Sequence, residues 1–376
     1  ATEALLQFPS DVDIDSSGNL YISDRSNNRI RKVGANGTIT TIVGLGAPGY
    51  EGDFGPAKDA LLKYPFGICL DNKDNLYIAD RGNNRVRKVD RWGIITTVAG
   101  DSTHSFGGDY GPANQSSLAY PTDVVVDVSG IIYIADRNNN RIRKVDQLGV
   151  ITTFMGIGQK EFNGDNEIAA ETTLHLPFAL ALYGKDRLLV VDRNHFRVRR
   201  VTLQGHQVET VAGNGKFLFR GDGGLGGGAT LDAPSGIVVD SHGNVLFVDR
   251  LHQRVRIVGP EGIIRTVVGN GKQGSEGNGG PASEAALHLP EVLTIDSRDN
   301  IYITQRSGNG WIVRKVDAQG VVTHFAGNGM QGNTGDGGPA TDASFHTISD
   351  INTDREGNVY IADSINRNIR RVDLQG

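Results

Sequence analysis

The hydrophobic residues of this chain come in short runs, and one pair of runs recurs from end to end. An apolar run at residues 20–24 follows a polar turn, and a polar loop separates it from a second run at residues 29–33. Copies of the pair span residues 19–33, 75–89, 131–145, 187–201, 244–258, 300–316 and 358–372. A fixed period of this length predicts a repeat architecture with one supersecondary unit per copy.

Two further runs complete each repeat. An apolar run precedes the pair, as at residues 64–71 and 233–240, and a β-branched run follows it, as at residues 38–43. Runs this short, separated by Gly, Asn and Pro, favour strands over helices. We call them strands a, b, c and d. Four antiparallel strands joined by tight turns make one propeller blade, so the expected fold class is an all-β propeller.

Three consensus strings describe the repeat: Pro-x-Gly-Ile-x-Val-Asp, then Gly-Asn-x-Tyr-Ile-Ala-Asp, then Asn-Asn-Arg-Ile-Arg-Lys-Val. In this order they resemble the NHL repeat over nearly the whole chain, most closely in the second and third copies. The Gly-rich link at residues 327–340 is similar to the long-loop NHL arrays of large extracellular proteins, teneurins included. The resemblance implies a scaffold for protein binding, RNA binding or, more rarely, catalysis, with extracellular, periplasmic or cell-surface placement.

The number of blades follows from counting the runs. Strands a, b and c occur seven times, whereas strand d occurs six times, last at residues 321–326. NHL propellers usually close with six blades. We predict seven blades, the last with three strands unless residues beyond this chain complete it, with six blades and one extra unit as the alternative. We expect residues 1–376 to form one domain of seven repeats of about 56 residues, cut from a longer protein.

Composition narrows the classes of partner. The formal net charge of −5 disfavours a nucleic-acid binder that works by neutralising phosphates. The 51 glycines lie mainly in turns and in the links between strand d and the next strand a. Cys69 lies in an apolar strand a, so we expect a buried small side chain and no disulfide within the chain. No apolar run reaches membrane-spanning length.

The b–c loops and the d–a links are expected on one face, which we call the loop face. Five copies place an Arg five residues after the Asp that ends strand b. Either the Asp anchors its own loop, or the arginines bind an acidic ligand. These arginines are Arg29, Arg85, Arg141, Arg197 and Arg254. In the sixth copy the loop is two residues longer, and Trp311 is interpreted either as an exposed anchor for a peptide or sugar, or as packing between blades.

Acidic residues near the expected axis form a second candidate site. Asp11, Asp123 and Asp350 share one position at the start of strand a, and Glu291 lies one step away. They could hold calcium or another divalent cation, or accept hydrogen bonds from amides of the adjacent strand. His175, His288 and His346 share a position that also holds Lys63, Ala119 and Asp232, so they are weak metal-ligand candidates. The Gly-Asp pairs in the links are expected to form turns rather than calcium loops.

Two functions remain open at this stage. The favoured one is a non-catalytic binding module, a scaffold that presents its loop face to a protein or glycan partner and needs no cofactor. The alternative is a metal-dependent lyase or hydrolase with an axial site, because some proteins of this fold, amidating lyases among them, use metal-binding histidines there. No Ser/His/Asp or Cys/His arrangement can be assembled from the spacing.

Overall fold

The computed structural model describes residues 4–165, 168–203 and 207–373. Within these ranges the secondary structure consists of strands and three-residue 3-10 turns. No helix there is long and apolar enough to cross a membrane. The chain divides into two compact units: unit one holds residues 1–192 and 201–209, and unit two holds residues 193–200 and 210–376.

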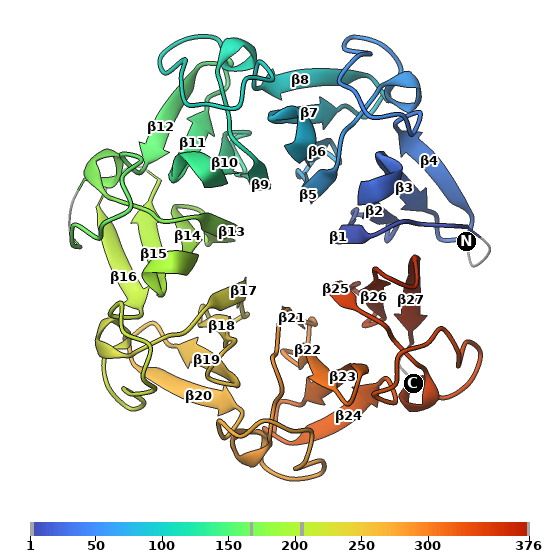
Figure 1. Ribbon diagram of the computed structural model, residues 1–376, viewed down its shortest axis with the longest axis vertical. Helices are drawn as coiled ribbons and strands as arrows, with labels where there is room; N and C mark the ends of the chain where they lie inside the picture. Colours follow the sequence, from blue (N-terminus) through green and yellow to red (C-terminus); the bar gives the residue numbers. More distant parts are fainter. Residues whose placement is uncertain (1–3, 166–167, 204–206, 374–376) are drawn as a thin grey trace. The chain divides into compact units, whose positions relative to one another are not determined.

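The strands follow the predicted order in every repeat (Figure 1). The first three sheets are β1 (Pro9–Ile14), β2 (Leu20–Asp24), β3 (Arg29–Val33), β4 (Ile39–Val43); β5 (Pro65–Leu70), β6 (Leu76–Asp80), β7 (Arg85–Val89), β8 (Ile95–Ala99); and β9 (Pro121–Val126), β10 (Ile132–Asp136), β11 (Arg141–Val145), β12 (Ile151–Met155). The boundary between the units runs through the fourth sheet, which holds β13 (Pro177–Tyr183), β14 (Arg187–Asp192), β15 (Arg197–Thr202) and β16 (Val208–Ala212).

The remaining sheets belong to unit two. They are β17 (Pro234–Val239), β18 (Val245–Asp249), β19 (Arg254–Val258), β20 (Ile264–Val268); β21 (Leu293–Ile295), β22 (Ile301–Ser307), β23 (Gly310–Val316), β24 (Val322–Ala326); and β25 (Ile348–Thr353), β26 (Val359–Asp363), β27 (Asn368–Val372). In the described residues six sheets therefore have four strands and the last has three. Within each of these sheets, strands that are consecutive in the chain pair antiparallel, as β10 with β11, β21 with β22, and β25 with β26 do. The prediction of a seven-bladed β-propeller with an incomplete last blade is confirmed.

The core consists of apolar clusters between successive blades. In unit one, Ile30 and Val43 of the first blade pack with Ile78 and Ile95 of the second. Strand b is buried at every position in β2, β6 and β10. In β6, neighbouring blades of unit one pack against both faces. The inner strands β1, β5, β9 and β13 of unit one lie side by side (Figure 1).

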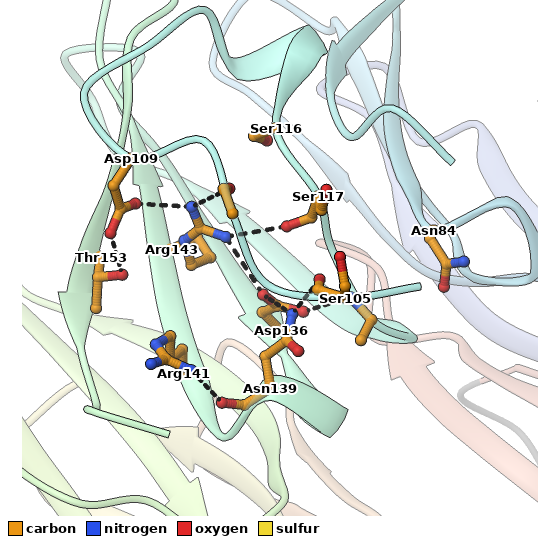
Figure 2. Close-up of polar contacts among 12 residues, drawn as sticks. Asn84, Ser105, Asp109, Ser116, Ser117, Asp136, Asn139, Arg141, Arg143 and Thr153 are labelled. Atoms are coloured by element: carbon orange, nitrogen blue, oxygen red, sulfur yellow. Dashed lines mark hydrogen bonds and ion pairs between the residues drawn. The ribbon is translucent and has the colours of Figure 1, made fainter. Parts of the chain in front are cut away.

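A buried arginine ties the strands of each regular blade together, as blade three shows (Figure 2). Arg143 is fully buried, and its Nη1 lies 3.5 Å from Oδ2 of the buried Asp136 at the end of β10. Its Nη2 donates to Oδ1 of Asp109 in the preceding link at 2.7 Å. Thr153 on β12 donates to Asp109 Oδ2 at 2.7 Å. We call this set the Asp–Arg–Asp brace, because it joins strand b, the link and strand d.

The brace recurs with the arginine seven residues after the first Asp. Arg87 lies 3.7 Å from Asp80 and 2.8 Å from Asp53, and Arg256 pairs with Asp249 at 3.2 Å and with Asp222 at 2.6 Å. The arginine that pairs with the Asp is therefore the one seven residues on, and not the one five residues on that the sequence motif had drawn attention to. The later arginine lies deeper in the blade, where water cannot solvate its charge and where carboxylates and backbone carbonyls compensate it.

Blade six lacks both carboxylates of the brace. Gln305 replaces the Asp at the end of strand b, and Asn278 replaces the link Asp. Arg314 is nevertheless fully buried. Its Nη1 donates to Ser275 O at 3.1 Å, while its Nη2 and Nε have no acceptor among the described residues. Burial lowers the pKa of Arg314, against the opposing effect of the Glu276 charge.

We expect Arg143→Met and Arg314→Met to change the free energy of unfolding by different amounts or in opposite directions. Removing Arg143 leaves Asp136 and Asp109 without their cation, which costs about 3 kcal/mol for a broken buried pair. Removing Arg314 deletes a buried cation that has no carboxylate, so stability should be unchanged or higher. Urea unfolding of both variants measures the difference. Equal losses in the two variants would contradict the role assigned to the brace.

In several blades the third residue of the b–c loop clasps the loop to the preceding link. In blade three, Asn139 Nδ2 donates to Asp136 Oδ2 at 2.8 Å and to Ser105 O at 2.8 Å (Figure 2). An amide NH2 group offers these two donors at any pH. The same clasp is made by Asn27, Asn83 and Asn366.

In blade five His252 takes the place of this asparagine. Its Nδ1 lies 2.8 Å from Asp249 Oδ2 and its Nε2 lies 2.5 Å from Phe217 O. Both partners are acceptors, so both ring nitrogens must donate, which only the imidazolium can do. Burial disfavours this charge, but the hydrogen bond and charge of Asp249 outweigh burial, and the pKa of His252 is raised. The clasp of blade five is therefore made by a charged side chain.

We expect this clasp to make stability depend on pH. A raised folded-state pKa means that the contribution of His252 is complete below its unfolded pKa of about 6.5 and is lost as pH rises through the folded-state pKa. His252→Asn should remove this slope, since an amide donates at any pH. Unfolding midpoints measured from about pH 6 to about pH 9 compare the two proteins. His242→Gln, at a side chain that is 74% exposed, is the control, and a slope that survives His252→Asn would assign it to another group.

Candidate functional site

The arginine that follows each brace Asp lies on the loop face. In unit one these residues are Arg25, Arg81 and Arg137, each the first residue of a 3-10 turn. Arg25 packs over the rings of Tyr64 and Phe66, with its guanidinium carbon 6.0 and 5.6 Å from the ring centres. The guanidinium of Arg81 lies 5.0 Å from the centre of Phe66. The Phe66 ring thus contacts guanidinium groups from two consecutive blades.

These three arginines have no acidic partner among the residues that the structure describes. Arg25, Arg81 and Arg137 form no ion pair within residues 4–165, 168–203 and 207–373, and the buried Nε of each has no acceptor there. Burial lowers the pKa of Arg81, and the charges of Arg25 and Arg137 lower it further. Three like charges are therefore close together without compensation. We call this set the arginine cluster.

Unit two shows how the fold neutralises such an arginine. Arg250, the equivalent residue of blade five, pairs through Nε with Glu291 Oε2 at 2.9 Å. Glu291 is the second residue of the next strand-a segment, so the predicted rim acid is the partner of an arginine. The same position in unit one holds Phe66 after Arg25, Thr122 after Arg81 and Phe178 after Arg137. The arginine cluster exists because these side chains carry no charge.

The arginines predicted from their spacing lie elsewhere on the loop face and bind backbone carbonyls. Arg29 Nη2 donates to Leu45 O at 2.7 Å, and Arg141 Nη2 donates to Ile157 O at 2.7 Å. The carbonyl partners of Arg85, Arg197 and Arg254 include Gly100, His195 and Asn270. These contacts hold loops and links in place, and a ligand-binding role for the five side chains stays a prediction.

Trp311 is 4% exposed, so the expectation of an exposed aromatic anchor is corrected. The longer loop continues the β22–β23 hairpin, and Trp311 pairs with Arg306 across it. The indole packs in the apolar cluster that contains Tyr302 and Phe345. A hairpin extended by two residues carries the ring into the core instead of to the surface, and packing was the other interpretation of its sequence.

Two of the predicted rim acids, Asp11 and Asp123, accept hydrogen bonds from backbone amides. Asp11 Oδ2 accepts from Ile68 N of the next blade at 2.6 Å, and Asp123 Oδ2 accepts from Leu180 N at 2.7 Å. Asp350 lies on β25 in unit two. The carboxylates of Asp11 and Asp123 therefore join successive inner strands. Within the described ranges no three His, Cys, Asp or Glu side chains are grouped to hold a metal, and a cation at the rim stays a prediction.

The three histidines occupy a position that the fold uses through its backbone. The amides of His175 and His346 donate to the Asp that ends strand b, Asp192 at 2.8 Å and Asp363 at 3.1 Å. The carbonyl of His288 accepts from Arg306 N at 2.8 Å. Because the backbone makes these contacts, the side chain is free to vary, as Lys63, Ala119 and Asp232 at the same position show. A metal-binding role for the histidines stays a prediction.

Comparison with known proteins supports the repeat assignment. The NHL repeat family model matches residues 6–33 and 62–89, and the Teneurin NHL domain model matches residues 103–216. NHL repeat-containing protein 2 of Homo sapiens is 29% identical over 289 residues, which cover 68% of this chain and 39% of that protein. Protein SUPPRESSOR OF QUENCHING 1, chloroplastic, of Arabidopsis thaliana is 29% identical over 331 residues, 83% of this chain and 30% of that protein. The chain thus spans well under half of either relative.

Solved structures show the same fold. The selenomethionine-substituted virginiamycin B lyase from Staphylococcus aureus superposes with a TM-score of 0.64 at 15% identity, over 99% of this chain and 98% of that chain. A likeness at this identity concerns the fold alone. The repeats matched by family models and the antiparallel blades agree: the chain is an NHL-repeat β-propeller.

Proposed function

We propose that this chain is a non-catalytic interaction module that binds acidic groups of a protein partner through its arginine cluster. The observation that carries the proposal is the absence of an acidic partner for Arg25, Arg81 and Arg137 among the described residues. A binding or interaction role is consistent with the NHL-repeat fold. The cluster adds a specific chemistry to that role, the recognition of carboxylates.

The geometry suits carboxylates. A guanidinium group presents paired donors that match the two oxygens of a carboxylate. The rings of Tyr64, Phe66 and Tyr120 hold Arg25 and Arg81 in place, so little side-chain entropy is lost on binding. Arginine and tyrosine are also the residues that most often dominate protein interfaces.

The charge and length of the whole chain bear on its partner and its setting. With a net charge of −5, the chain favours an acidic protein segment over a nucleic acid, which would need a broad basic surface. We further propose that residues 1–376 act as one domain of a longer protein, because the chain spans 39% and 30% of the two relatives. Extracellular, periplasmic or cell-surface placement remains a proposal as well, since one relative is named chloroplastic.

A metal-dependent lyase or hydrolase remains the alternative function. It rests on the fold alone, because one structure of the same fold is a lyase. In the described part of the chain, no group of metal-ligating side chains favours this alternative.

The proposal is tested with a fluorescent Glu-rich peptide of about ten residues, long enough to reach several guanidinium groups. Thr122→Glu should give Arg81 the partner that Glu291 gives Arg250. We expect its affinity for the peptide to fall at least about tenfold, which is about 1.4 kcal/mol. Fluorescence anisotropy measures the affinity, and a thermal melt confirms that the variant is folded.

Lys272→Gln, which removes one exposed charge from a link of unit two, is the matched control and should bind like the parent protein. Unchanged peptide binding by Thr122→Glu would reject the arginine cluster as the site. Tighter binding of a single-stranded RNA of equal length would replace the acidic protein by a nucleic acid.

A further inference from the structure

A groove of about 640 Å³ lies between the first two blades of unit one, and its lining includes a–b and c–d turns and the link residues Pro56 and Lys58. Trp92, Arg91 and Lys58 line it together with Tyr21 and Lys32. None of these residues belongs to the arginine cluster. A volume of this size is within the range of small-ligand sites.

Trp92 is presented by a rigid turn. Its amide donates to Asp90 Oδ1 at 2.9 Å, and Gly93 N donates to Asp90 O at 2.9 Å. The indole side chain is 72% exposed. The Arg91 guanidinium carbon lies 4.3 Å from the ring centre, so a cation stands over the indole. The turn therefore holds an aromatic surface and a positive charge side by side in solvent.

Three acidic and three basic side chains line the groove. Asp15 Oδ2 accepts from Lys32 Nζ at 3.0 Å, while Asp74 Oδ2 accepts from the neutral Ser16 Oγ at 2.9 Å and Asp90 Oδ1 accepts from the amide of Trp92 at 2.9 Å. Arg91 and Lys58 are exposed and form no ion pair with any residue in the described ranges. Two cations thus face the groove without partners.

The next inter-blade groove provides an internal comparison. It measures about 390 Å³ and is lined by the equivalent positions of blades two and three. Leu148, Gln147 and Asn114 stand there in place of Trp92, Arg91 and Lys58. The same backbone forms without the indole and the two cations. The three residues of the first groove are therefore not needed for the blade itself.

We propose that the first groove binds an acidic saccharide, a uronate-bearing oligosaccharide. The apolar face of a sugar ring would stack on the Trp92 indole, and a uronate carboxylate would meet Arg91 and Lys58. An extended peptide is disfavoured because the link already covers the β8 edge at the groove. Phe54 N donates to Ile95 O at 2.8 Å, and Ile95 N donates to Gly55 O at 3.1 Å, so no strand can be added there.

Tryptophan fluorescence tests this proposal on the full chain. The protein has two tryptophans, and Trp311 is 4% exposed, so a change in emission on binding reports Trp92. We expect trigalacturonate to change the emission saturably and neutral maltotriose to leave it unchanged. Arg91→Gln and Lys58→Asn introduce the residues found in the second groove. Each should raise the Kd for trigalacturonate at least about tenfold.

Reciprocal substitution gives a gain of function. In a Trp92→Leu, Arg91→Gln, Lys58→Asn background, calorimetry should show no trigalacturonate binding. Adding Leu148→Trp, Gln147→Arg and Asn114→Lys should restore it in the second groove. Thr122→Glu, which gives Arg81 of the arginine cluster an acidic partner, should bind trigalacturonate like the parent protein. The saccharide site and the protein-binding site can therefore be confirmed or rejected separately.

Two outcomes would overturn the proposal. If trigalacturonate leaves the emission unchanged, or if Arg91→Gln and Lys58→Asn bind it with unchanged Kd, the groove is not a saccharide site. If triglutamate binds as tightly as trigalacturonate, the site recognises acidic peptides or any polyanion, and the assignment to a saccharide is wrong.

Discussion

A buried guanidinium group is the constraint on which the regular blades depend. Removing an arginine from water costs several kcal/mol, and the cost is offset only when carboxylates and carbonyls surround the charge. Arg143 takes these partners from the end of strand b and from the preceding link, and Thr153 connects the link to strand d. One charge thus holds together strand b, the preceding link and, through Thr153, strand d. Blade six, with a buried Arg314 and no carboxylate, shows that apolar packing can hold a blade when the brace is incomplete.

The brace also decides which side chains remain available on the loop face. Because Asp136 is engaged inside the blade, the neighbouring Arg137 receives no help from it and points to the loop face with its Nε unpaired. The loop arginines Arg29 and Arg141 are used in turn by carbonyls of the links. Arg25, Arg81 and Arg137 take part in none of these contacts among the described residues. The candidate binding groups are therefore side chains that the contacts shared by the repeats do not engage.

Deviations between copies identify the candidate sites more clearly than the shared motif does. Glu291 neutralises Arg250, whereas Phe66 and Thr122 leave the equivalent arginines of unit one unpaired. Trp92 stands where blade three has Leu148, on the same turn and beside the same kind of groove. In both cases another copy supplies the substitution that should abolish the site without disturbing the fold.

The sequence by itself determined the strands, the seven repeats and the missing last strand, because these depend on local patterns of apolar and turn-forming residues. It also indicated that the Asp ending strand b anchors its loop. Only the tertiary structure decided that Arg87 and not Arg85 reaches Asp80, that Trp311 is buried, and which arginines lack partners. The physical reason is separation along the chain: Glu291 lies 41 residues after Arg250, and Ile68 lies 57 residues after Asp11. Compensation of a charge depends on such distant neighbours, and the repeat period carries no information about them.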